Sequence, residues 1–365
     1  MPRVLVDLLF FTGKQGGTET VAREVYSRFF DRPGWEFVGY ASSELYAKGA
    51  DWFPGRLIDS GLTTTKRAQW AFGEVTGVAR AARATQADLI HSPANFGPPR
   101  TRVPLVLTLH DALAFKHPEF LPSRVGVIPT QLLIRSAARS AAHIVTDSVA
   151  SQNDIVDLLG IPAERVSVVM PGSSGARPSG TAERAPDRLF TLGNRMPHKN
   201  FPRLIEALAL IPEDRRPVLT ISGSHAEDPL TAVVAEHSLE KWVQLRSWLE
   251  REEVDDLYAT STAVVFPTLF EGFGLPALEA MERGCPVICS DIPVLREVAG
   301  DAAAYFDPTD AAAMADAIQS ALRDPAGLAR NAELGLERAT LFSWDRTADE
   351  LLAVFDDVAR TTRGR

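Results

Sequence analysis

The sequence predicts an α/β protein built from two doubly wound domains, and three observations support this prediction. Short apolar runs repeatedly end in polar or glycine-rich turns and are followed by helix-like segments, which is the pattern of a parallel sheet covered by helices. The 365 residues exceed the size of one ordinary core. The run PGSSGARPSGTAERAP, from Pro171 to Pro186, has the composition of a flexible linker and separates two sets of candidate strands.

Each predicted strand is a short apolar run. The first half contains Arg3–Phe11, Leu89–His91, Leu105–His110 and His143–Thr146, and the second half contains Leu189–Leu192, Val218–Ile221, Val264–Phe266 and Val287–Cys289. Apolar residues from Leu351 to Val358 recur at helical spacing and predict an amphipathic closing helix. Parallel sheets bind ligands beyond the carboxyl ends of their strands, so the residues that follow each strand are the candidates for function.

The composition limits the function classes. Hydrophobic residues make up 45% of the chain and charged residues 23%, as in soluble globular proteins. The formal net charge of −9 argues against a nucleic-acid partner. It also weakens a purely electrostatic attachment to anionic lipid, although a local basic patch leaves peripheral membrane contact open.

We expect neither a transmembrane segment nor a disulfide. The first apolar run, VLVDLLFF, is short, carries Asp7 and lacks a small-residue cleavage site, so we interpret it as a strand rather than a signal peptide. Cys285 and Cys289 lie four residues apart in CPVICS. On one face of a strand they would be roughly 13 Å apart, which is too far for a disulfide. Buried thiols predict a reducing, cytoplasmic location.

The stretch LFEGFGLPALEAMERGCPVICSD contains two glutamates eight residues apart, Glu271 and Glu279. Pro276 suits the first turn of a helix, and Gly284 supplies a C-terminal stop. Glu271 is therefore expected in the loop after the strand Val264–Phe266, and Glu279 about one turn into the helix. The two carboxylates belong to different local structures that would face one ligand.

Between these glutamates, the glycines allow a ligand to approach the main chain closely. The amides of Gly274, Leu275 and Ala277 at the helix start would attract an anion such as phosphate. Carboxylates beside a phosphate must bond hydroxyl groups to avoid repulsion, and sugars supply hydroxyls. The alternative is a plain strand-turn-helix unit whose two glutamates are solvated.

The segment LGNRMPHKN places two cations after the strand Leu189–Leu192. Arg195 and Lys199 could neutralise a diphosphate leaving group, a task that a divalent metal performs in other transferases. Asn200 could cap the helix that NFPRLIEAL should form. The sequence contains no Asp-x-Asp pair and no zinc-spaced ligand set, so we expect no metal and no cofactor. Solvated surface charges are the alternative interpretation of the two cations.

In the first half, FTGKQGGTETVAREV places Gly16 and Gly17 between a strand and a helix, with Thr18 or Thr20 as the expected cap. The spacing differs from a dinucleotide fingerprint, but adjacent glycines allow close approach to phosphates; a simple tight turn is the alternative. His110 ends the run PLVLTLH, where a histidine can bond a sugar hydroxyl or assist loss of a proton, or serve structure alone.

Taken together, QGGTE, LTLHD, GNRMPHKN, EGFGLPALEAMERGCPVICSD and FSWDRTADELL resemble the retaining family-4 glycosyltransferases of GT-B fold. The resemblance covers nearly the whole chain in the right order. It implies two Rossmann-like domains facing each other across a cleft. Residues 1–171 would bind the acceptor and residues 172–343 the nucleotide-sugar donor, while the closing helix, about 344–365, would pack back on the first domain.

The resemblance also implies roles for particular residues. The catalytic set is Glu271, His110, Arg195 and Lys199, with Glu271 on the transferred sugar, the two cations on the diphosphate and His110 at the donor sugar. Glu279 would bind the ribose. The other donor-binding residues implied are Gly16, Gly17, Gly223, Trp248, Leu249, Gly272, Phe273, Gly274 and Leu275. Ser247 stands where the family usually has a glycine, which weakens the assignment of Trp248 or Leu249 to the base.

The predicted function is therefore metal-independent transfer of a hexose, with retention of configuration, from a nucleoside diphosphate sugar to a saccharide or other hydroxyl acceptor, as in polysaccharide biosynthesis. Likeness of RMPHKN and EGFGLP to mannosyl- and rhamnosyltransferase sequences suggests mannose. A covalent role of Glu271 stays open. So do a nucleotide-sugar epimerase or phosphorylase of the same fold, and a non-catalytic protein that binds nucleotide sugars.

Overall fold

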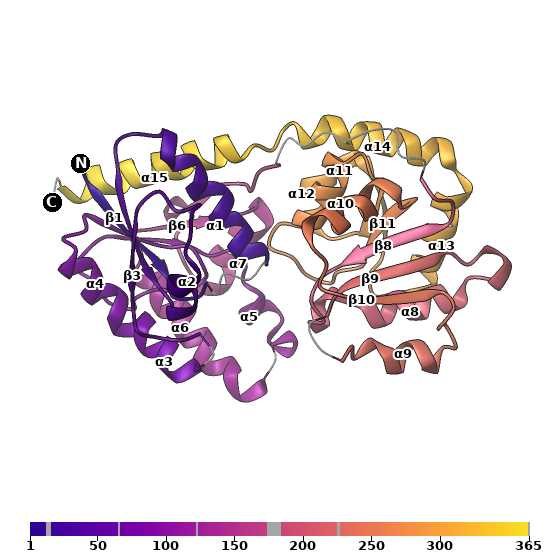
Figure 1. The fold of residues 1–365 in the computed structure, drawn as a ribbon, viewed down its shortest axis with the longest axis horizontal. Helices are drawn as coiled ribbons and strands as arrows, with labels where there is room; N and C mark the ends of the chain where they lie inside the picture. The colour runs from indigo at the N-terminus through magenta and orange to yellow at the C-terminus, as the bar shows by residue number, and fades with distance from the viewer. Residues whose placement is uncertain (12–15, 65, 122, 174–183, 225–226, 364–365) are drawn as a thin grey trace. The chain divides into compact units, whose positions relative to one another are not determined.

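The structure is a computed structural model, and it describes residues 1–11, 16–64, 66–121, 123–173, 184–224 and 227–363 (Figure 1). Contacts divide the chain into two compact units. Unit 1 comprises Met1–Gly172 and Trp344–Arg365, and unit 2 comprises Ser173–Ser343. The sequence analysis placed the boundary between residues 171 and 172, within the linker, of which residues 174–183 lie outside the described residues.

Unit 1 is built on a seven-stranded parallel sheet with the strand order β3-β2-β1-β4-β5-β6-β7. Its strands are β1 (Arg3–Leu8), β2 (Glu36–Ala41), β3 (Arg56–Asp59), β4 (Leu89–Ser92), β5 (Leu105–Thr108), β6 (His143–Thr146) and β7 (Val166–Val168). The central strands are buried on both faces, as expected where helices cover a parallel sheet.

Unit 2 is built on a six-stranded parallel sheet with the strand order β10-β9-β8-β11-β12-β13. Its strands are β8 (Arg188–Leu192), β9 (Val218–Ser224), β10 (Val243–Ser247), β11 (Ala263–Phe266), β12 (Val287–Ser290) and β13 (Ala303–Phe306). The order reverses from β8, so β9 and β11 flank it on opposite sides. The carboxyl ends of β8, β9 and β11 are thus neighbours at one edge of the sheet.

Helices connect consecutive strands in both units, except between β4 and β5, which a loop joins (Figure 1). Unit 1 contains α1 (Gly17–Ser27), α2 (Ser43–Lys48), α3 (Arg67–Phe72), α4 (Val78–Ala84), α5 (Leu113–Lys116), α6 (Val127–Ser140), α7 (Val149–Leu159) and the closing α15 (Trp344–Arg363). Unit 2 contains α8 (Phe201–Leu210), α9 (Leu230–Glu236), α10 (Arg251–Thr260), α11 (Leu275–Glu282), α12 (Pro293–Ala299), α13 (Ala311–Arg323) and α14 (Pro325–Ala339). The predicted α/β class with two doubly wound parallel sheets is confirmed.

All eight predicted strands exist, but two of them end earlier than expected. β1 stops at Leu8 because the chain turns there, with the Leu9 amide donating to Asp7 Oδ1 at 3.2 Å. β5 stops at Thr108, because the amide of His110 donates to the side chain of Asn95 at 2.7 Å. Sequence analysis missed five strands: β2, β3, β7, β10 and β13. Four of these, β3, β7, β10 and β13, are edge strands of their sheets and are partly exposed, so their apolar runs are weak.

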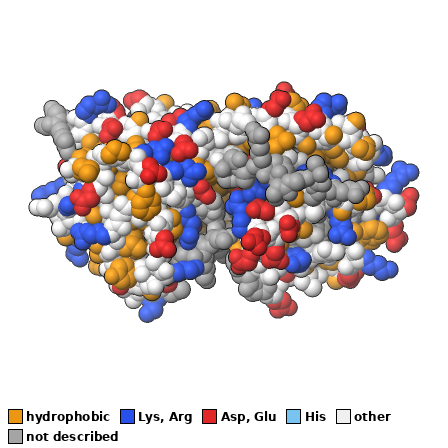
Figure 2. Space-filling model, turned by 45° about the horizontal axis from the view of Figure 1, so that its top comes forward, with side chains coloured by type: hydrophobic (Ala, Val, Ile, Leu, Met, Phe, Trp, Pro, Cys, Tyr) orange, Lys and Arg blue, Asp and Glu red, His pale blue; other side chains and the backbone are white. Residues whose placement is uncertain are grey.

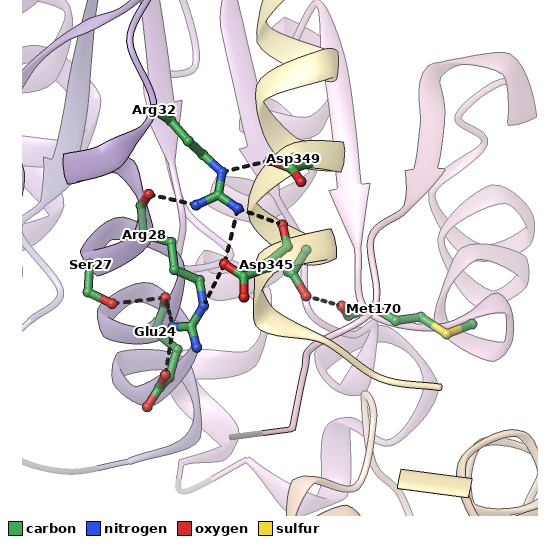
Figure 3. Close-up of polar contacts among 8 residues, drawn as sticks. Glu24, Ser27, Arg28, Arg32, Met170, Asp345 and Asp349 are labelled. Carbon is green, nitrogen blue, oxygen red and sulfur yellow. Dashed lines mark hydrogen bonds and ion pairs between the residues drawn. The ribbon is translucent and has the colours of Figure 1, made fainter. Parts of the chain in front are cut away.

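Ion pairs and hydrogen bonds join the closing helix α15 to the rest of unit 1 (Figure 3). Arg32 donates from Nε to Asp349 at 2.6 Å and forms an ion pair with Asp345 at 3.1 Å. On another side of the helix, the hydroxyl of Thr347 donates to the carbonyl of Met170 at 2.7 Å. The amphipathic helix expected from Leu351 to Val358 is confirmed within α15, since Leu351, Phe355 and Val358 are buried.

The visible surface mixes acidic, basic and hydrophobic side chains (Figure 2). Despite the net charge of −9, the acidic side chains on that face are interspersed with basic ones and form no continuous acidic surface there. In the described part of the chain, no helix combines the length and the apolar character needed to cross a membrane. Cys285 and Cys289 are both free and buried, as predicted.

Candidate active site

The carboxyl ends of β8 and β9 approach each other through two glycines in unit 2. Gly193 follows β8, and Gly223 lies near the end of β9 with a φ of +112°. A Cβ atom on Gly223 would stand 2.4 Å from the carbonyl oxygen of Gly193. Gly223 was expected to contact the donor; the structure shows that glycine is also required here to bring the two strand ends together.

Arg195, in the turn after β8, is almost fully enclosed by protein partners. Its Nε and Nη2 atoms bond the carboxylate of Asp228 at distances between 2.6 and 3.1 Å. Its Nη1 donates to the carbonyls of Gly193 and Ser222 at 2.9 and 3.0 Å, and Nη2 also reaches the carbonyl of Ile221 at 3.4 Å. These bonds engage all five N–H donors of the guanidinium.

This enclosure changes what Arg195 can do for an anionic ligand. Only 9% of its side chain is exposed, and 10% of that of Asp228. Burial favours the neutral form of Asp228, but the hydrogen bonds and charge of Arg195 outweigh burial and lower its pKa. A diphosphate can bond Arg195 only if a protein partner releases it. Sequence analysis missed Asp228, which lies on a different loop and has no pattern of its own.

Lys199 and Glu271 meet at the same edge of the sheet. Lys199 lies in the 3-10 turn Pro197–Lys199 before α8, and Glu271 lies in the loop after β11. Lys199 Nζ donates to Glu271 Oε1 at 2.6 Å, and each side chain is 13% exposed. The ammonium also lies 5.5 Å from the ring centroid of Phe266. Two residues 72 positions apart, predicted from separate motifs, therefore form one charged pair.

The loop that carries Glu271 and Gly272 leads into α11, which begins at Leu275 as predicted. Gly274 has a φ of +104°, and a Cβ atom there would lie 2.6 Å from Leu295 Cδ2, so this position requires glycine. One expectation is wrong: the amide of Ala277 donates to the Gly274 carbonyl at 3.0 Å instead of facing a ligand. The amides of Gly274 and Leu275 precede this first bond of the helix.

Glu279 lies one turn into α11, as expected, in a different polar environment from Glu271. Tyr258 donates its hydroxyl to Glu279 Oε2 at 3.2 Å, and Arg251 lies 4.0 Å from Oε1. Burial raises the pKa of Glu279, although the positive charges of Arg283 and Arg251 oppose this. Sequence analysis missed Tyr258, a fully buried residue of α10 whose role depends on packing against α11.

The segment after β10 holds the residues assigned to the base. The amide of Trp248 donates to the carbonyl of Ser224 at 2.9 Å, which ties this segment to the end of β9. Leu249 is buried and Trp248 is half-buried. Phe273, on the neighbouring loop, is buried with its ring 5.7 Å from that of Phe342. The roles of Trp248 and Leu249 stay predictions.

Two further residues of the β8–α8 turn behave differently from expectation. Asn200 stands at the N-cap of α8, but its side chain does not cap the helix; it donates to the carbonyls of Pro267 and Pro308 at 3.0 and 2.8 Å. It thereby joins this turn to the ends of β11 and β13. His198, which sequence analysis did not consider, has its pKa lowered to about 4 by burial and by the charge of Lys199. It is neutral at pH 7.

In unit 1, the glycine pair begins α1. Gly16 is the N-cap residue and Gly17 the first residue of the helix. The expected side-chain cap is wrong: Thr18 and Thr20 lie inside α1, and the amide of Thr20 donates to the Gly16 carbonyl at 2.8 Å. Residues 12–15, which precede the pair, lie outside the described residues.

His110, also in unit 1, is buried between two acceptors. Nδ1 lies 2.8 Å from Asp147 Oδ2, and Nε2 lies 3.0 Å from the carbonyl oxygen of Pro93. Burial alone would lower the His110 pKa, but the charge and hydrogen bond of Asp147 outweigh burial and raise it. Each ring nitrogen thus faces a protein acceptor, so His110 can act as a base toward a ligand only with a nitrogen that carries no proton and has left its protein partner. Its role at the donor sugar stays a prediction.

A pair of buried acids lies at the end of β1. Asp7 accepts hydrogen bonds from the Leu9 amide at 3.2 Å and the Ser92 hydroxyl at 3.1 Å. Burial raises the pKa of Asp7 to about 6. Glu74, in the π-helical turn Gly73–Gly77, has its pKa raised well above the usual value by burial and by the charge of Asp7. Two such carboxyls cannot both be ionised at low cost, so they share a proton near neutral pH.

Comparison with known proteins supports the same assignment for both halves of the chain. A family model described as "Glycosyltransferase Family 4" matches residues 15–173, and one described as "Glycosyl transferases group 1" matches residues 177–335. The chain is 32% identical over 284 residues to O-antigen chain mannosyltransferase B of Escherichia coli, which covers 73% of this chain and 74% of that protein. It is 26% identical over 225 residues to O-antigen chain mannosyltransferase RfbU of Salmonella typhimurium, with 61% and 62% covered.

Solved structures share the fold over almost the full length. Sucrose-phosphate synthase from Thermosynechococcus elongatus superposes with a TM-score of 0.80 at 18% identity, covering 99% of this chain and all of that one. The Anabaena protein HepE in complex with UDP and glucose superposes with a TM-score of 0.76 at 19% identity, covering 98% of this chain and 100% of that one. The two parallel sheets, the matched family models and the relatives together show that this chain is a glycosyltransferase that belongs to family 4 and has the GT-B fold.

Proposed function

We propose that the protein is a retaining, metal-independent hexosyltransferase that uses a nucleoside diphosphate sugar. The observation that carries the proposal is the pair of Lys199 and Glu271 beside the start of α11. This part of unit 2 brings together a cation, a carboxylate and the amides that precede the first hydrogen bond of α11. Such a combination suits a ligand in which a diphosphate is joined to a sugar. Unit 2 is accordingly the donor unit, and unit 1 takes the acceptor.

Lys199 is the cation placed to neutralise the leaving diphosphate. Its ammonium has three N–H donors, and the bond to Glu271 Oε1 uses one of them. The amides of Gly274 and Leu275, at the positive end of the α11 dipole, add to the attraction for phosphate. In this scheme the positive charge comes from the chain and no metal is needed, because Lys199 and the helix start supply what a divalent ion would supply.

The two glutamates bind hydroxyl groups on either side of the diphosphate. Glu271 accepts from the transferred sugar and Glu279, oriented by Tyr258, accepts from the ribose. The sugar then passes to an acceptor hydroxyl on the face from which the diphosphate departs. The bond from the anomeric carbon to the phosphate oxygen breaks, the bond to the acceptor oxygen forms, and the acceptor proton moves to the departing phosphate oxygen.

The relatives favour mannose as the transferred sugar, because the 32% identical Escherichia coli protein is named as a mannosyltransferase. Guanosine diphosphate is accordingly the first nucleotide to test. Uridine diphosphate is the second, since the similar Anabaena structure contains UDP. A saccharide chain is the acceptor class that we infer, because two relatives are named as O-antigen chain mannosyltransferases.

The test is thermal unfolding with GDP, UDP, dTDP and ADP, each with excess chelator and again with magnesium. A ligand at about 100 times its dissociation constant adds roughly 2.7 kcal/mol, which shifts Tm by several degrees. We expect a chelator-resistant shift with one nucleotide. A shift that appears only with magnesium, or none with any nucleotide, would contradict the proposed donor site.

Variants then separate transfer from binding. Glu271→Gln should lower the transfer rate by about 100-fold or more. Because Glu271 is only 13% exposed and pairs with Lys199, the variant should also lose stability, so transfer is compared well below the Tm of both proteins. The matched control is Glu252→Gln, at an exposed position of α10, which should transfer normally. Product analysis distinguishes the rival functions: an epimerised sugar nucleotide formed without acceptor would indicate an epimerase, and tight binding without turnover would indicate a non-catalytic protein.

A further inference from the structure

A π-helical turn brings a buried acid against the end of β1 in unit 1. The turn comprises Gly73–Gly77 and joins α3 to α4. Glu74, its second residue, is 2% exposed. A Cβ atom on Gly73 would stand 2.5 Å from Leu62 Cδ1 and 2.9 Å from Leu9 Cδ1, so glycine allows the turn to approach the residue that follows β1. Single π-helical turns are rare and occur frequently at functional sites.

Asp7 and Glu74, which we name the acid pair, meet inside unit 1. Asp7 is the last residue but one of β1 and is 4% exposed. The two side chains are hydrogen-bonded to each other, and a hydrogen bond between two carboxyl groups requires a proton on one of them. In the described part of the chain, no lysine or arginine forms an ion pair with either carboxyl. The proton therefore holds the acid pair together.

Trp70 of α3 connects the acid pair to a cluster of aromatic rings. It lies four residues before Glu74, about one helical turn, and its indole is close enough to oppose the effects of burial and of Asp7 on the pKa of Glu74. The centroid of its ring is 4.7 Å from that of Phe96 and 6.4 Å from that of Phe10. The rings of Phe10 and Phe96 are 6.3 Å apart. We name Phe10, Trp70 and Phe96 the aromatic edge.

The aromatic edge lies at the carboxyl ends of the central strands, where parallel sheets bind ligands. Phe10 follows β1 and is 45% exposed, and Phe96 follows β4. Asn95, the residue before Phe96, accepts a hydrogen bond from the His110 amide at 2.7 Å. The aromatic edge therefore adjoins the segment that carries His110. An exposed ring beside polar groups suits a sugar, whose ring has an apolar face and a rim of hydroxyl groups.

We propose that Glu74 is a positioning residue for the acceptor: while the acid pair holds its proton, Glu74 keeps Trp70 and the aromatic edge in place at the carboxyl end of β1. Loss of the proton to solvent leaves two buried carboxylates in contact, and these repel each other where little water screens them. The repulsion is relieved when the π-helical turn moves away from β1 and takes Trp70 with it. The identity of the acceptor rests on the proposed function, whereas the action of the acid pair on Trp70 does not.

The direction of the pH effect follows from the two carboxyls. Burial raises the pKa of Asp7 to about 6, and burial and the charge of Asp7 raise that of Glu74 well above its usual value. One proton therefore remains in the acid pair above about pH 6 and is lost as the pH rises through the folded pKa of Glu74. The position of Trp70 is fixed at the acidic end of this range and becomes loose toward alkaline pH.

The other titratable groups around the acid pair stay neutral in this range. Burial, and then the charge of Asp7, raise the pKa values of Tyr26 on α1 and Tyr40 on β2, so both phenols keep their protons. Asp59 and Arg80 have weaker, opposite effects on Tyr40. Burial lowers the pKa of His91 on β4 to about 3, so this ring carries no charge.

His110 on β5 is the neighbouring group that can also titrate. Burial alone would lower its pKa, but Asp147 outweighs burial and raises it. Its ring nitrogens face Asp147 and the carbonyl of Pro93 and neither member of the acid pair. A change with pH that disappears when Glu74 is replaced therefore cannot come from His110.

The first experiment follows Trp70 by acrylamide quenching of tryptophan fluorescence in the full chain, without ligand, at about pH 6 and about pH 9. Trp70→Phe supplies the contribution of the other tryptophans. The quenching constant of Trp70, obtained by difference, should rise by about threefold or more at the higher pH. In Glu74→Gln, whose amide can donate to Asp7 and does not titrate, it should stay at the low value. Asp7→Asn, which removes the other carboxyl, should abolish the pH effect as well.

The control for these variants is Glu164→Gln, at an exposed position of the 3-10 turn Ala163–Arg165 in the same unit. Its Trp70 should respond to pH like that of the wild type, because the acid pair is intact.

The second experiment measures the affinity of the full chain for methyl α-mannoside, a probe for a saccharide acceptor, by saturation-transfer NMR without nucleotide. The dissociation constant of the wild type should rise by about threefold or more between the same two pH values, and that of Glu74→Gln should stay constant. Phe10→Ala should weaken binding at both pH values, because it removes the exposed ring. The matched control is Phe30→Ala, which should bind normally, since Phe30 is 58% exposed in the 3-10 turn Arg28–Asp31 that follows α1.

The proposal is overturned if quenching of Trp70 is the same at both pH values, or if it changes with pH as much in Glu74→Gln as in the wild type. It is also overturned if methyl α-mannoside does not bind, or if its affinity changes with pH equally in the two proteins, because Glu74 would then have no role toward an acceptor. Neither experiment includes nucleotide, so a failure of the proposed donor site would leave both results unchanged.

Discussion

Replacing Asp228 by asparagine tests whether its buried ion pair with Arg195 stabilises the loops that follow β8 and β9 in unit 2. Asp228 is the single charged partner among the groups that bond Arg195, and both side chains are about nine-tenths buried. Asparagine keeps the shape and one acceptor oxygen but removes the negative charge. The guanidinium would then remain buried next to a neutral group.

The expected loss of stability follows from this burial. Breaking a buried pair by removing one partner costs about 3–5 kcal/mol, because the other charge stays desolvated. Since asparagine still accepts one hydrogen bond, we expect the lower end, about 3 kcal/mol. For a unit of this size, each kcal/mol shifts Tm by about 2–4 °C, which predicts a decrease of roughly 6–12 °C.

The assay is calorimetric unfolding of the ligand-free protein, with Asp291→Asn as the control. Asp291 binds Arg296 in a bidentate pair of the same unit, but the two side chains are about half exposed, so its loss should cost about 1 kcal/mol or less. The pKa of Asp228 is lowered in the folded state, so its stabilisation is present above the ordinary pKa and is lost as pH falls through the folded value. The Tm difference between wild type and Asp228→Asn should therefore shrink below about pH 4.

One result would refute this reasoning directly. The free energy of unfolding of Asp228→Asn could differ from that of the wild type by only about 0.5 kcal/mol, as for a surface substitution. In that case the ion pair does not stabilise the loop. If the pair also competes with the ligand, the nucleoside diphosphate that binds should raise the Tm of Asp228→Asn by more than it raises the wild-type Tm, because Arg195 no longer has to leave a carboxylate. An equal rise in both proteins would show that the ligand leaves Arg195 in place.

Two other predictions concern buried side chains. The Tm of Glu74→Gln should rise relative to that of the wild type as pH increases from 5 to 8. The pKa of Glu74 is raised in the folded state, so folding of the wild type binds a proton. Wild-type stability therefore falls as pH rises through the folded pKa, whereas glutamine does not titrate. A gap that stays constant across this range would mean that Glu74 and Asp7 do not share a proton. Tyr258→Phe removes the hydroxyl that bonds Glu279 and should weaken nucleoside diphosphate binding by about 3- to 10-fold, measured by titration calorimetry. Binding of inorganic pyrophosphate, which has no ribose, should be unchanged, and equal weakening of both would place Glu279 elsewhere than at the ribose.

Local patterns were sufficient for the parts of the fold whose causes are local. The start of α11 follows from a glycine that needs positive φ and a proline in the first turn, and both lie within three residues. The closing helix follows from apolar spacing. In contrast, the edge strands β3, β7 and β10 have few buried residues, because one side of each strand has no neighbour in the sheet, and this leaves no clear alternation to recognise.

The site residues also combine features that local sequence patterns predict with features that only the fold decides. The sequence by itself determined that Glu271, Glu279, Arg195 and Lys199 follow strands or begin helices, since strand and helix signals are short-range. Only the tertiary structure decided their partners: Lys199 meets Glu271, Arg195 meets Asp228, and Glu279 meets Tyr258. The physical reason is that these pairs join residues between 21 and 72 positions apart, which are brought together by the order of parallel strands and by the packing of α10 on α11. No local preference of the chain encodes which carboxylate each of the two cations will meet.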